Sequence, residues 1–307
     1  MSHTWSSATG QTDRPSPPRY ASNLFTALEY QFSIECEEEA VGRYIDDIFS
    51  GLTGSEDRGE AAAVYRIERL PDSGAQTHRL TLDGRHLATT ITLARAMQFL
   101  LWHINRTTVA MSQTTLLIHA AGVAHTGQAI VMPAGEEAGK TTLAAGLLQQ
   151  GFDYLSDEIV AIDPETLQAR SYAKPLSIDP GSWPVLPALK PSLPADLSSL
   201  QADQWQVPLR AIHERGPVTS APIRYIIAPR YVAGARTSLV PLPRSSALRE
   251  LAENAFNFRG FPGGLDVLAS VVRRSDCFRL TVGSLEEACT LVREVVSTSR
   301  LNERSQQ

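Results

Sequence analysis

One eight-residue segment, residues 134–141, constrains the fold of this 307-residue chain more than any other. It reads Ala-Gly-Glu-Glu-Ala-Gly-Lys-Thr, which has the form [A/G]-x-x-x-x-G-K-[S/T] of a phosphate-binding loop. The apolar run 129–132 precedes it, and the helix-like run 142–148 follows it. A strand that leads through such a loop into a helix presents backbone N–H groups to a polyphosphate. The segment therefore predicts an α/β nucleotide-binding unit, although an ordinary small-residue turn after a strand is the alternative.

The side chains of this loop are predicted to have different roles. Lys140 would reach the terminal phosphates, and the Thr141 hydroxyl would ligate Mg²⁺. Glu136 and Glu137 would repel a phosphate if they pointed inward, so we expect them to project to solvent or to a cation. The predicted nucleotide contacts are Gly135, Glu136, Glu137, Ala138, Gly139, Lys140, Thr141 and Thr142.

Composition excludes several classes of protein. Hydrophobic residues make up 43% of the chain and charged residues 20%, which is ordinary for a globular protein. The net charge of −5 gives no basic surface for nucleic acid, and no apolar run approaches the length of a membrane span. The three cysteines show no C-x-x-C spacing, and the N-terminus lacks a signal-peptide pattern. We therefore expect a cytoplasmic protein with buried thiols and no nucleic-acid or membrane partner.

The chain is predicted to have three parts. Residues 1–20, rich in Ser, Thr and Pro, read as a disordered lead. Residues 21–112 read as a small α+β domain and residues 113–300 as the domain that carries the loop. Within the second domain, seven prolines fall between Lys174 and Pro208, so residues 174–208 are predicted to be a long surface excursion without regular elements.

Hydrophobic periodicity predicts the individual elements. Helices are expected over 33–47, 92–107, 142–150, 245–257, 265–273 and 285–297. Strands are expected over 64–70, 78–82, 116–124, 129–132, 152–162, 223–228 and 277–282.

An acidic pair, Asp157 and Glu158, lies in the middle of the strand predicted over 152–162. Neighbouring strand residues point to opposite faces, so both reach one site only at a strand end or a bulge. We assign Asp157 as the candidate base for an acceptor hydroxyl and Glu158 as the carboxylate on the Mg²⁺ side. A polar pair at an exposed strand end is the alternative.

Two further residues are candidates. His119 interrupts the apolar run 116–124, where a core histidine is as reasonable as a functional one. Arg259 follows the helix predicted over 245–257 and could deliver charge to a transferring phosphoryl group, although a surface arginine is the simpler interpretation.

Read together, residues 118–120, 135–142 and 155–158, with Gly151, resemble the C-terminal domain of bacterial HPr kinase/phosphorylase. The resemblance is closer to the wider group of HPr-kinase-related proteins. That family has a histidine in the strand before its loop, a Gly-Lys-Ser/Thr sequence, a helix closed by glycine and an acidic pair. The match lies in residues 114–163, is weak to about 297 and is absent from 1–112.

The resemblance implies a fold and an activity. It implies a P-loop-containing, HPr-kinase-like (PEP-carboxykinase-like) kinase domain that uses ATP and Mg²⁺, preceded here by the smaller α+β domain. Asp157, His119 and Lys140 match the catalytic positions, and Thr141 and Glu158 match the metal side. The loop has Glu-Glu-Ala where the family usually has a Ser-Gly pattern, and no acidic residue before Arg-Gly follows Asp163. Phosphorolysis and HPr as substrate are therefore not implied.

The expected function is transfer of a phosphoryl group from ATP to a hydroxyl, most simply a serine of a peptide or protein, as in peptide-tailoring kinases. Three alternatives stay open: a small-molecule kinase acting on free serine or a similar compound, a nucleotide-dependent peptide-binding protein, and a regulatory NTPase. Related kinases are often hexamers, so a homo-oligomer is possible, but no residue of this chain argues for one.

Overall fold

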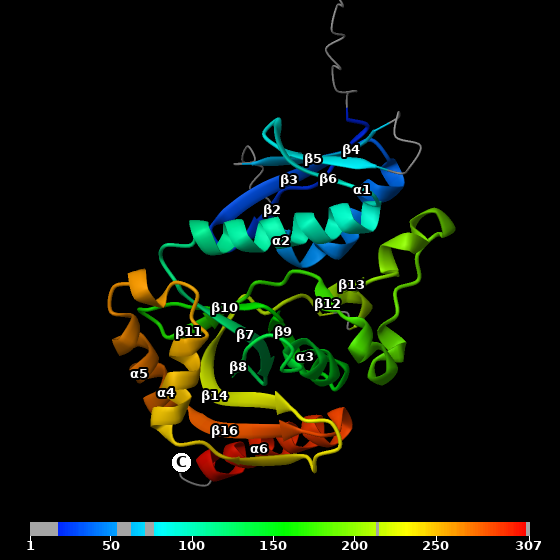
Figure 1. Ribbon diagram of the computed structural model, residues 1–307. Helices are drawn as coiled ribbons and strands as arrows, with labels where there is room; N and C mark the ends of the chain where they lie inside the picture. The colour runs from blue at the N-terminus through cyan, green and yellow to red at the C-terminus, as the bar shows by residue number, and fades with distance from the viewer. Residues whose placement is uncertain (1–17, 54–62, 71–76, 213–214, 305–307) are drawn as a thin grey trace, which may run out of the picture.

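The computed structural model describes residues 18–53, 63–70, 77–212 and 215–304, without side chains beyond residue 298 (Figure 1). Most of the predicted disordered lead lies outside these residues. The architecture is mixed α/β, as expected from the sequence, and is built on two main sheets. No helix in the described ranges has both the length and the apolar character needed to cross a bilayer.

The N-terminal part is a six-stranded sheet with helices on one face. The strand order is β1-β3-β4-β5-β6, with β2 paired to β3, and only the β3–β4 pair is parallel. In Figure 1 helices α1 and α2 lie between this sheet and the rest of the molecule, so the opposite face of the sheet is turned outward. The elements are β1 (Tyr20–Ala21), β2 (Phe25–Ala27), β3 (Tyr30–Cys36), α1 (Glu39–Ile48), β4 (Val64–Arg69), β5 (His78–Leu82), β6 (Arg85–Thr90) and α2 (Leu93–Met111).

Helix α2 forms where the amphipathic pattern predicted it. The Thr92 side chain accepts a hydrogen bond from the Arg95 N–H at 3.2 Å, which caps the first turn. The apolar residues of the pattern are buried in the core between helix and sheet: Leu93, Met97, Leu100, Leu101 and Ile104.

The helix predicted over 33–47 is wrong at its start. Residues 33–36 belong to strand β3, where Tyr30, Phe32, Ile34 and Cys36 are buried and the residues between them are more exposed. This two-residue period is the signature of a strand with one buried face. Helix α1 begins only at Glu39.

The second part is an eight-stranded sheet around the predicted loop. Its order is β11-β10-β7-β8-β14-β16-β15, with β9 also paired to β7. Strand β14 runs parallel to both β8 and β16. The elements are β7 (Leu116–His125), β8 (Gln128–Pro133), α3 (Lys140–Gln149), β9 (Asp153–Ser156), β10 (Ile159–Ile162), β11 (Gln168–Arg170), β14 (Ser220–Tyr231), β15 (Ser238–Pro241), α4 (Arg244–Glu253), α5 (Gly264–Arg274), β16 (Asp276–Val282) and α6 (Leu285–Arg304).

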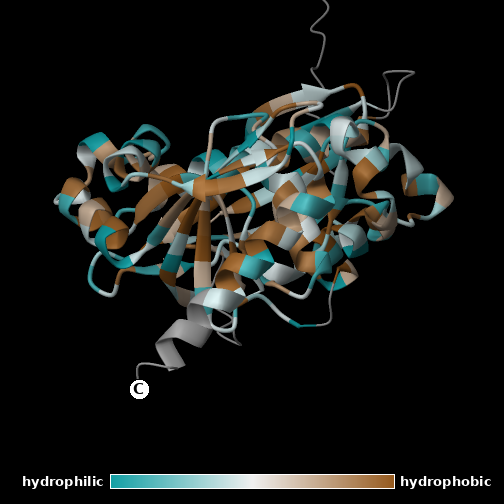
Figure 2. Cartoon of the chain, turned by 90° about the horizontal axis from the view of Figure 1, so that it is seen from below, coloured by the Kyte–Doolittle hydropathy of each residue, from teal (hydrophilic) through white to brown (hydrophobic). Residues whose placement is uncertain are grey.

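Helices cover both faces of this sheet. Ala121 and Val123 of β7 pack with α3 and α6, whereas Ala120 and Ala124 pack with α4 and α5. Figure 2 shows the hydrophobic central strands enclosed between the two helical layers. A strand buried on both faces has a nearly continuous apolar run, as residues 116–124 do apart from His119.

The Pro-rich segment 174–208 is folded, which corrects the expectation of an irregular surface excursion. Strands β12 (Leu176–Ile178) and β13 (Trp205–Val207) pair antiparallel, and 3-10 helices η2 (Pro180–Val185), η3 (Pro187–Leu189) and η4 (Ala195–Gln201) lie between them. Prolines occupy the first turns of η2 and η3, where no backbone N–H is needed. Trp183 stacks on Trp205 with ring centroids 4.8 Å apart.

One apolar core crosses the predicted domain boundary at residue 113. The N-terminal core includes Leu117 of β7, Ile159 and Ala161 of β10, and Tyr172. Gly51 lies so close to the second part that an added Cβ would be 2.3 Å from the Ala173 carbonyl oxygen. The two main sheets therefore share a packed interface, and the division into two separate domains stays a prediction.

Candidate active site

The predicted phosphate-binding loop connects β8 to α3. Gly139 is the N-cap of α3 with φ 84°, a left-handed conformation that glycine adopts without strain, and its carbonyl accepts from the Leu143 N–H at 2.9 Å. Glu137 also has a positive φ of 58°. No atom lies within 4 Å of a Cβ built on Gly135, so that side of the loop is open. Glu136 and Glu137 are exposed, in line with the expectation that they project outward.

Lys140 folds back across this loop. Its Nζ donates a hydrogen bond to the Gly135 carbonyl at 2.7 Å, and only 7% of the residue is exposed. Burial lowers the pKa of Lys140, whereas the negative charges of Glu158, Asp157 and Glu136 act to raise it. The ammonium thus lies in the electrostatic field of three carboxylates. Its hydrogen-bond acceptor, the Gly135 carbonyl, is neutral, and a charged phosphate oxygen would be a stronger acceptor that could replace it.

The acidic pair lies in a break between two strands. The single strand predicted over 152–162 is wrong: β9 ends at Ser156 and β10 begins at Ile159. The Ser156 hydroxyl accepts hydrogen bonds from the N–H groups of Glu158 (3.2 Å) and Ile159 (3.0 Å), which stabilises the turn. Asp157 and Glu158 therefore occupy the strand-end position that a shared site requires. Both strands pair with β7, whose His119 lies opposite Ile159.

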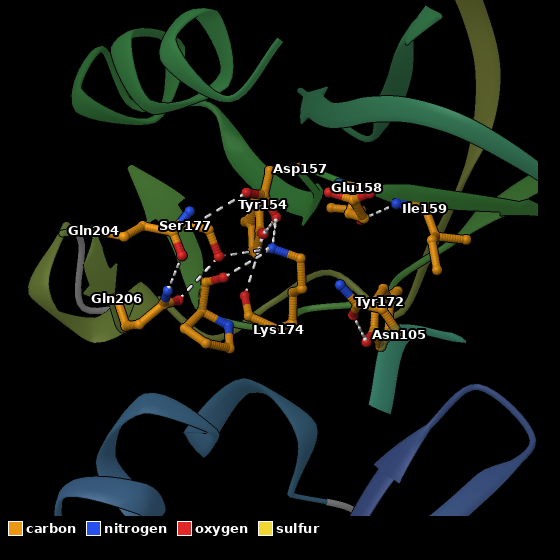
Figure 3. Close-up of polar contacts among 12 residues, drawn as sticks. Asn105, Tyr154, Asp157, Glu158, Ile159, Tyr172, Lys174, Ser177, Gln204 and Gln206 are labelled. Atoms are coloured by element: carbon orange, nitrogen blue, oxygen red, sulfur yellow. Dashed lines mark hydrogen bonds and ion pairs between the residues drawn. The ribbon is translucent and has the colours of Figure 1, made fainter. Parts of the chain in front are cut away.

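Asp157 is enclosed by hydrogen bonds and an ion pair (Figure 3). Its Oδ1 lies 2.8 Å from Lys174 Nζ and accepts from the Tyr154 hydroxyl at 2.8 Å. Its Oδ2 accepts from the Ser177 N–H at 3.3 Å. Asp157 and Lys174 are 1% and 2% exposed, so this is a fully buried ion pair.

The network continues into the Pro-rich segment. Lys174 Nζ also donates to the Pro175 carbonyl at 3.1 Å and to the Ser177 hydroxyl at 3.4 Å. The Ser177 hydroxyl in turn donates to Gln206 Oε1 of β13 at 2.9 Å. Sequence reasoning gave Lys174 no role. Lys174 is one of only three lysines in the sequence, which could have marked it as a candidate functional residue. Nothing in the sequence, however, shows that it lies beside Asp157.

His119 and Glu158 lie at the more accessible side of the pair. His119 Nε2 is 3.6 Å from Glu158 Oε1, and the two side chains are 18% and 36% exposed. Burial, with a smaller effect of Lys140, lowers the pKa of His119 to about 4, so the imidazole is neutral at pH 7. Burial raises the pKa of Glu158, which the charge of Lys174 opposes. His119 is therefore a polar neighbour of Glu158 rather than a cation.

The first turn of α3 contacts the Pro-rich segment. The hydroxyls of Thr142 and Ser182, on η2, are 2.5 Å apart. Thr141 is half-buried and follows Lys140 directly, whereas Ala138 is half-buried within the loop. Helix η2 thus covers one side of the helix N-terminus that the predicted nucleotide would face.

The residues fit a magnesium ion held mainly by phosphate and water. Among the described residues no group of three or more His, Cys, Asp or Glu side chains lies close enough to bind a metal. Mg²⁺ bound with nucleotide needs only one or two protein ligands and keeps several waters. The predicted pair, Thr141 and Glu158, matches that requirement in number and in chemistry, and the carboxylates around Lys140 supply the negative field.

Comparison with known proteins gives a distant structural likeness. No protein-family model matches the chain, and no curated protein matches it. Among solved structures, the HPr(Ser) kinase/phosphatase from Coxiella burnetii aligns over 61% of this chain and 98% of its own. The identity is 10% and the TM-score is 0.31. At that level of similarity the function has to be argued from the site itself.

Proposed function

We propose that the chain is a nucleotide-dependent phosphotransferase that moves the γ-phosphoryl group of ATP to a hydroxyl, most simply a serine of a peptide or protein. The observation that supports this best is the position of Lys140. A buried ammonium lies across a strand–loop–helix turn and in the field of the acidic pair that follows β9. Phosphoryl transfer needs this combination of phosphate cradle, cation and carboxylates.

The proposed roles combine the assignments made from the sequence with the positions of these residues in the site. The loop amides and Lys140 would bind and orient the phosphates, and Thr141 and Glu158 would hold Mg²⁺, which would supply positive charge to offset developing negative charge. Neutral His119, whose Nε2 lies 3.6 Å from Glu158 Oε1, is a polar neighbour that would favour one orientation of that carboxylate. Most of the rate enhancement would come from positioning and electrostatics.

The proton acceptor has two candidates. Asp157 is the assignment made from the sequence, but it is 1% exposed and both of its oxygens already accept hydrogen bonds. An acceptor hydroxyl would reach it only after residues 174–177 move. Glu158 is the accessible carboxylate of the pair. Asp157→Asn is the informative variant, because Glu158→Gln would also remove the proposed Mg²⁺ ligand. Transfer retained by Asp157→Asn would exclude Asp157 as the base and leave Glu158.

The central test uses Lys140→Ala with γ-labelled ATP and a serine-peptide library. Loss of the ammonium should cost several kcal/mol of transition-state stabilisation, on the order of a thousandfold in rate. Lys190→Ala is the matched control, because Lys190 is exposed and distant in sequence from the loop. Turnover by Lys140→Ala at the wild-type rate would refute the proposal.

The same assay separates the other activities. Labelled phosphate released without an acceptor would indicate an NTPase, and labelled free serine would indicate a small-molecule kinase. ATP binding without transfer to any acceptor would indicate a nucleotide-dependent binding protein.

A further inference from the structure

A cavity of about 630 Å³ lies between the C-terminal end of α2 and the segment that joins α4 to α5. In Figure 1 that end of α2 lies above this segment, which is coloured orange. The N-terminal part of the chain therefore contributes one wall of the cavity and the loop-bearing part the other. The residues that line it include Ala110, Ser112, Phe256, Phe258, Arg259 and Phe261.

The cavity adjoins the candidate active site through Phe256. The Phe256 ring is 45% exposed, and its centroid is 5.5 Å from that of His119. The backbone N–H of His119 donates to the Asn254 carbonyl at 2.7 Å, and the backbone N–H of Phe256 donates to the Leu117 carbonyl at 2.9 Å. Residues 254–256 are thus fixed alongside β7, and a group in the cavity is one side chain away from His119 and Glu158.

The lining combines aromatic surface with an unneutralised positive charge. Three phenylalanines supply apolar area, and Arg259 is exposed with no ion-pair partner among the described residues. Glu253, the acidic residue of the lining, lies 4.0 Å from Arg249. At the α2 wall, Ser112 is 2% exposed and its hydroxyl has no hydrogen-bond partner in the described part of the chain. A guanidinium beside aromatic rings suits a ligand that presents a carboxylate next to an apolar group.

We propose that this cavity binds the acceptor peptide, with an apolar or aromatic residue next to the phosphorylated serine packed on Phe256 and Phe261 and a carboxylate of the peptide on Arg259. This inference rests on the proposed phosphotransferase activity and adds the acceptor side of the site. It gives the N-terminal part a function, because the end of α2 forms the far wall and limits the size of the residue that fits.

The test fills the cavity from the α2 side in the full-length protein. Ala110 is exposed and lines the cavity, so Ala110→Trp narrows it without disturbing the core. Met111→Trp is the matched control on the same helix, since Met111 is 52% exposed and lies outside the lining. The substrate is a library of peptides with one fixed serine and randomised flanks, with free serine as a separate arm and ATP affinity measured in parallel.

We expect the wild type to select peptides with an acidic group and an apolar or aromatic neighbour. Ala110→Trp should lower peptide turnover about tenfold or more with ATP affinity unchanged, because a filled pocket removes acceptor binding alone. Arg259→Gln should remove the acidic preference, and Met111→Trp should behave as wild type.

Several results would overturn this inference while leaving the phosphotransferase standing. They are wild-type peptide turnover by Ala110→Trp, selection without acidic or apolar preference, and labelling of free serine alone. No ATP binding, or no transfer to any acceptor, would instead remove the proposed function itself.

Discussion

At the scale of single residues, the buried Lys174–Asp157 ion pair is the feature with the largest expected energetic effect. Each charge is almost fully removed from water and is compensated by the other and by Tyr154 and Ser177. Removing one partner of such a pair leaves an unpaired buried charge, whereas replacing both with apolar residues is often neutral. The pair can therefore be changed in two ways that separate folding from catalysis.

We predict that Lys174→Met alone destabilises the protein by about 3–5 kcal/mol, since Asp157 would be buried without its counter-charge. The double variant Lys174→Met/Asp157→Leu should recover most of that loss in urea unfolding. If it folds and binds ATP yet transfers no phosphoryl group, the ion pair of Asp157 and Lys174 is needed for chemistry. Full activity of the double variant would assign Asp157 and Lys174 a purely structural role.

At the scale of elements, Gly135 and Gly139 have different roles in the loop that leads into α3. Gly139 has φ 84°, and the nearest atom to a built Cβ is 3.5 Å away, so a side chain there meets backbone strain rather than a clash. Gly135 has open space and no left-handed φ. The two positions form a natural pair of variants in one loop.

We predict that Gly139→Ala lowers the free energy of unfolding by about 1–2 kcal/mol, the cost of a left-handed conformation in an L-residue. Gly135→Ala should unfold like the wild type, because nothing in the protein opposes its Cβ. In ATP titrations Gly135→Ala should bind more weakly, since the new methyl group occupies the side that a phosphate approaches. Unchanged ATP affinity in Gly135→Ala would argue against a nucleotide on that side.

Sequence reasoning worked best for elements with a long, clean period. The amphipathic pattern of residues 92–107 predicted α2, because a helix that buries one face repeats its apolar residues every three to four positions. The apolar run 116–124 predicted β7, because a strand buried on both faces is apolar at almost every position. The strand break at residues 157–158 was missed because Ser156 makes it, through side-chain bonds to two backbone N–H groups. The folding of residues 174–208 was missed because proline density hid short 3-10 helices whose leucines pack into distant cores. Contacts such as Lys174 with Asp157 depend on tertiary structure and have no local pattern.

At the scale of the whole molecule, Glu29 ties the N-terminal sheet to the connection between α2 and β7. Its carboxylate accepts hydrogen bonds from the N–H groups of Gln113 and Thr114, both at 3.0 Å. Partial burial alone would raise the pKa of Glu29, but these bonds lower it below its ordinary value of 4.5. The ionised form is thus favoured by the folded state.

We predict that Glu29 contributes stability that is present above pH 4.5 and is lost as the pH falls through its lowered folded-state pKa. Glu29→Gln should unfold more easily than the wild type at pH 7 by at most about 1 kcal/mol, because Glu29 is exposed and solvent screens its charge, and the difference should shrink in acid. Urea unfolding at pH 7 and at about pH 3.5 measures both values. An equal difference at the two pH values would show that the charge of Glu29 has no part in this link.

The shared core between the two main sheets has a practical consequence for anyone who wishes to work with a shorter protein. A truncation that begins at residue 113 would leave Leu117, Ile159, Ala161 and Tyr172 without the side chains that now shield them from water. Such a fragment is expected to self-associate or to precipitate, although it would contain the entire loop and both carboxylates. A shorter fragment intended to keep the candidate site in soluble form should therefore include helix α2 and its sheet.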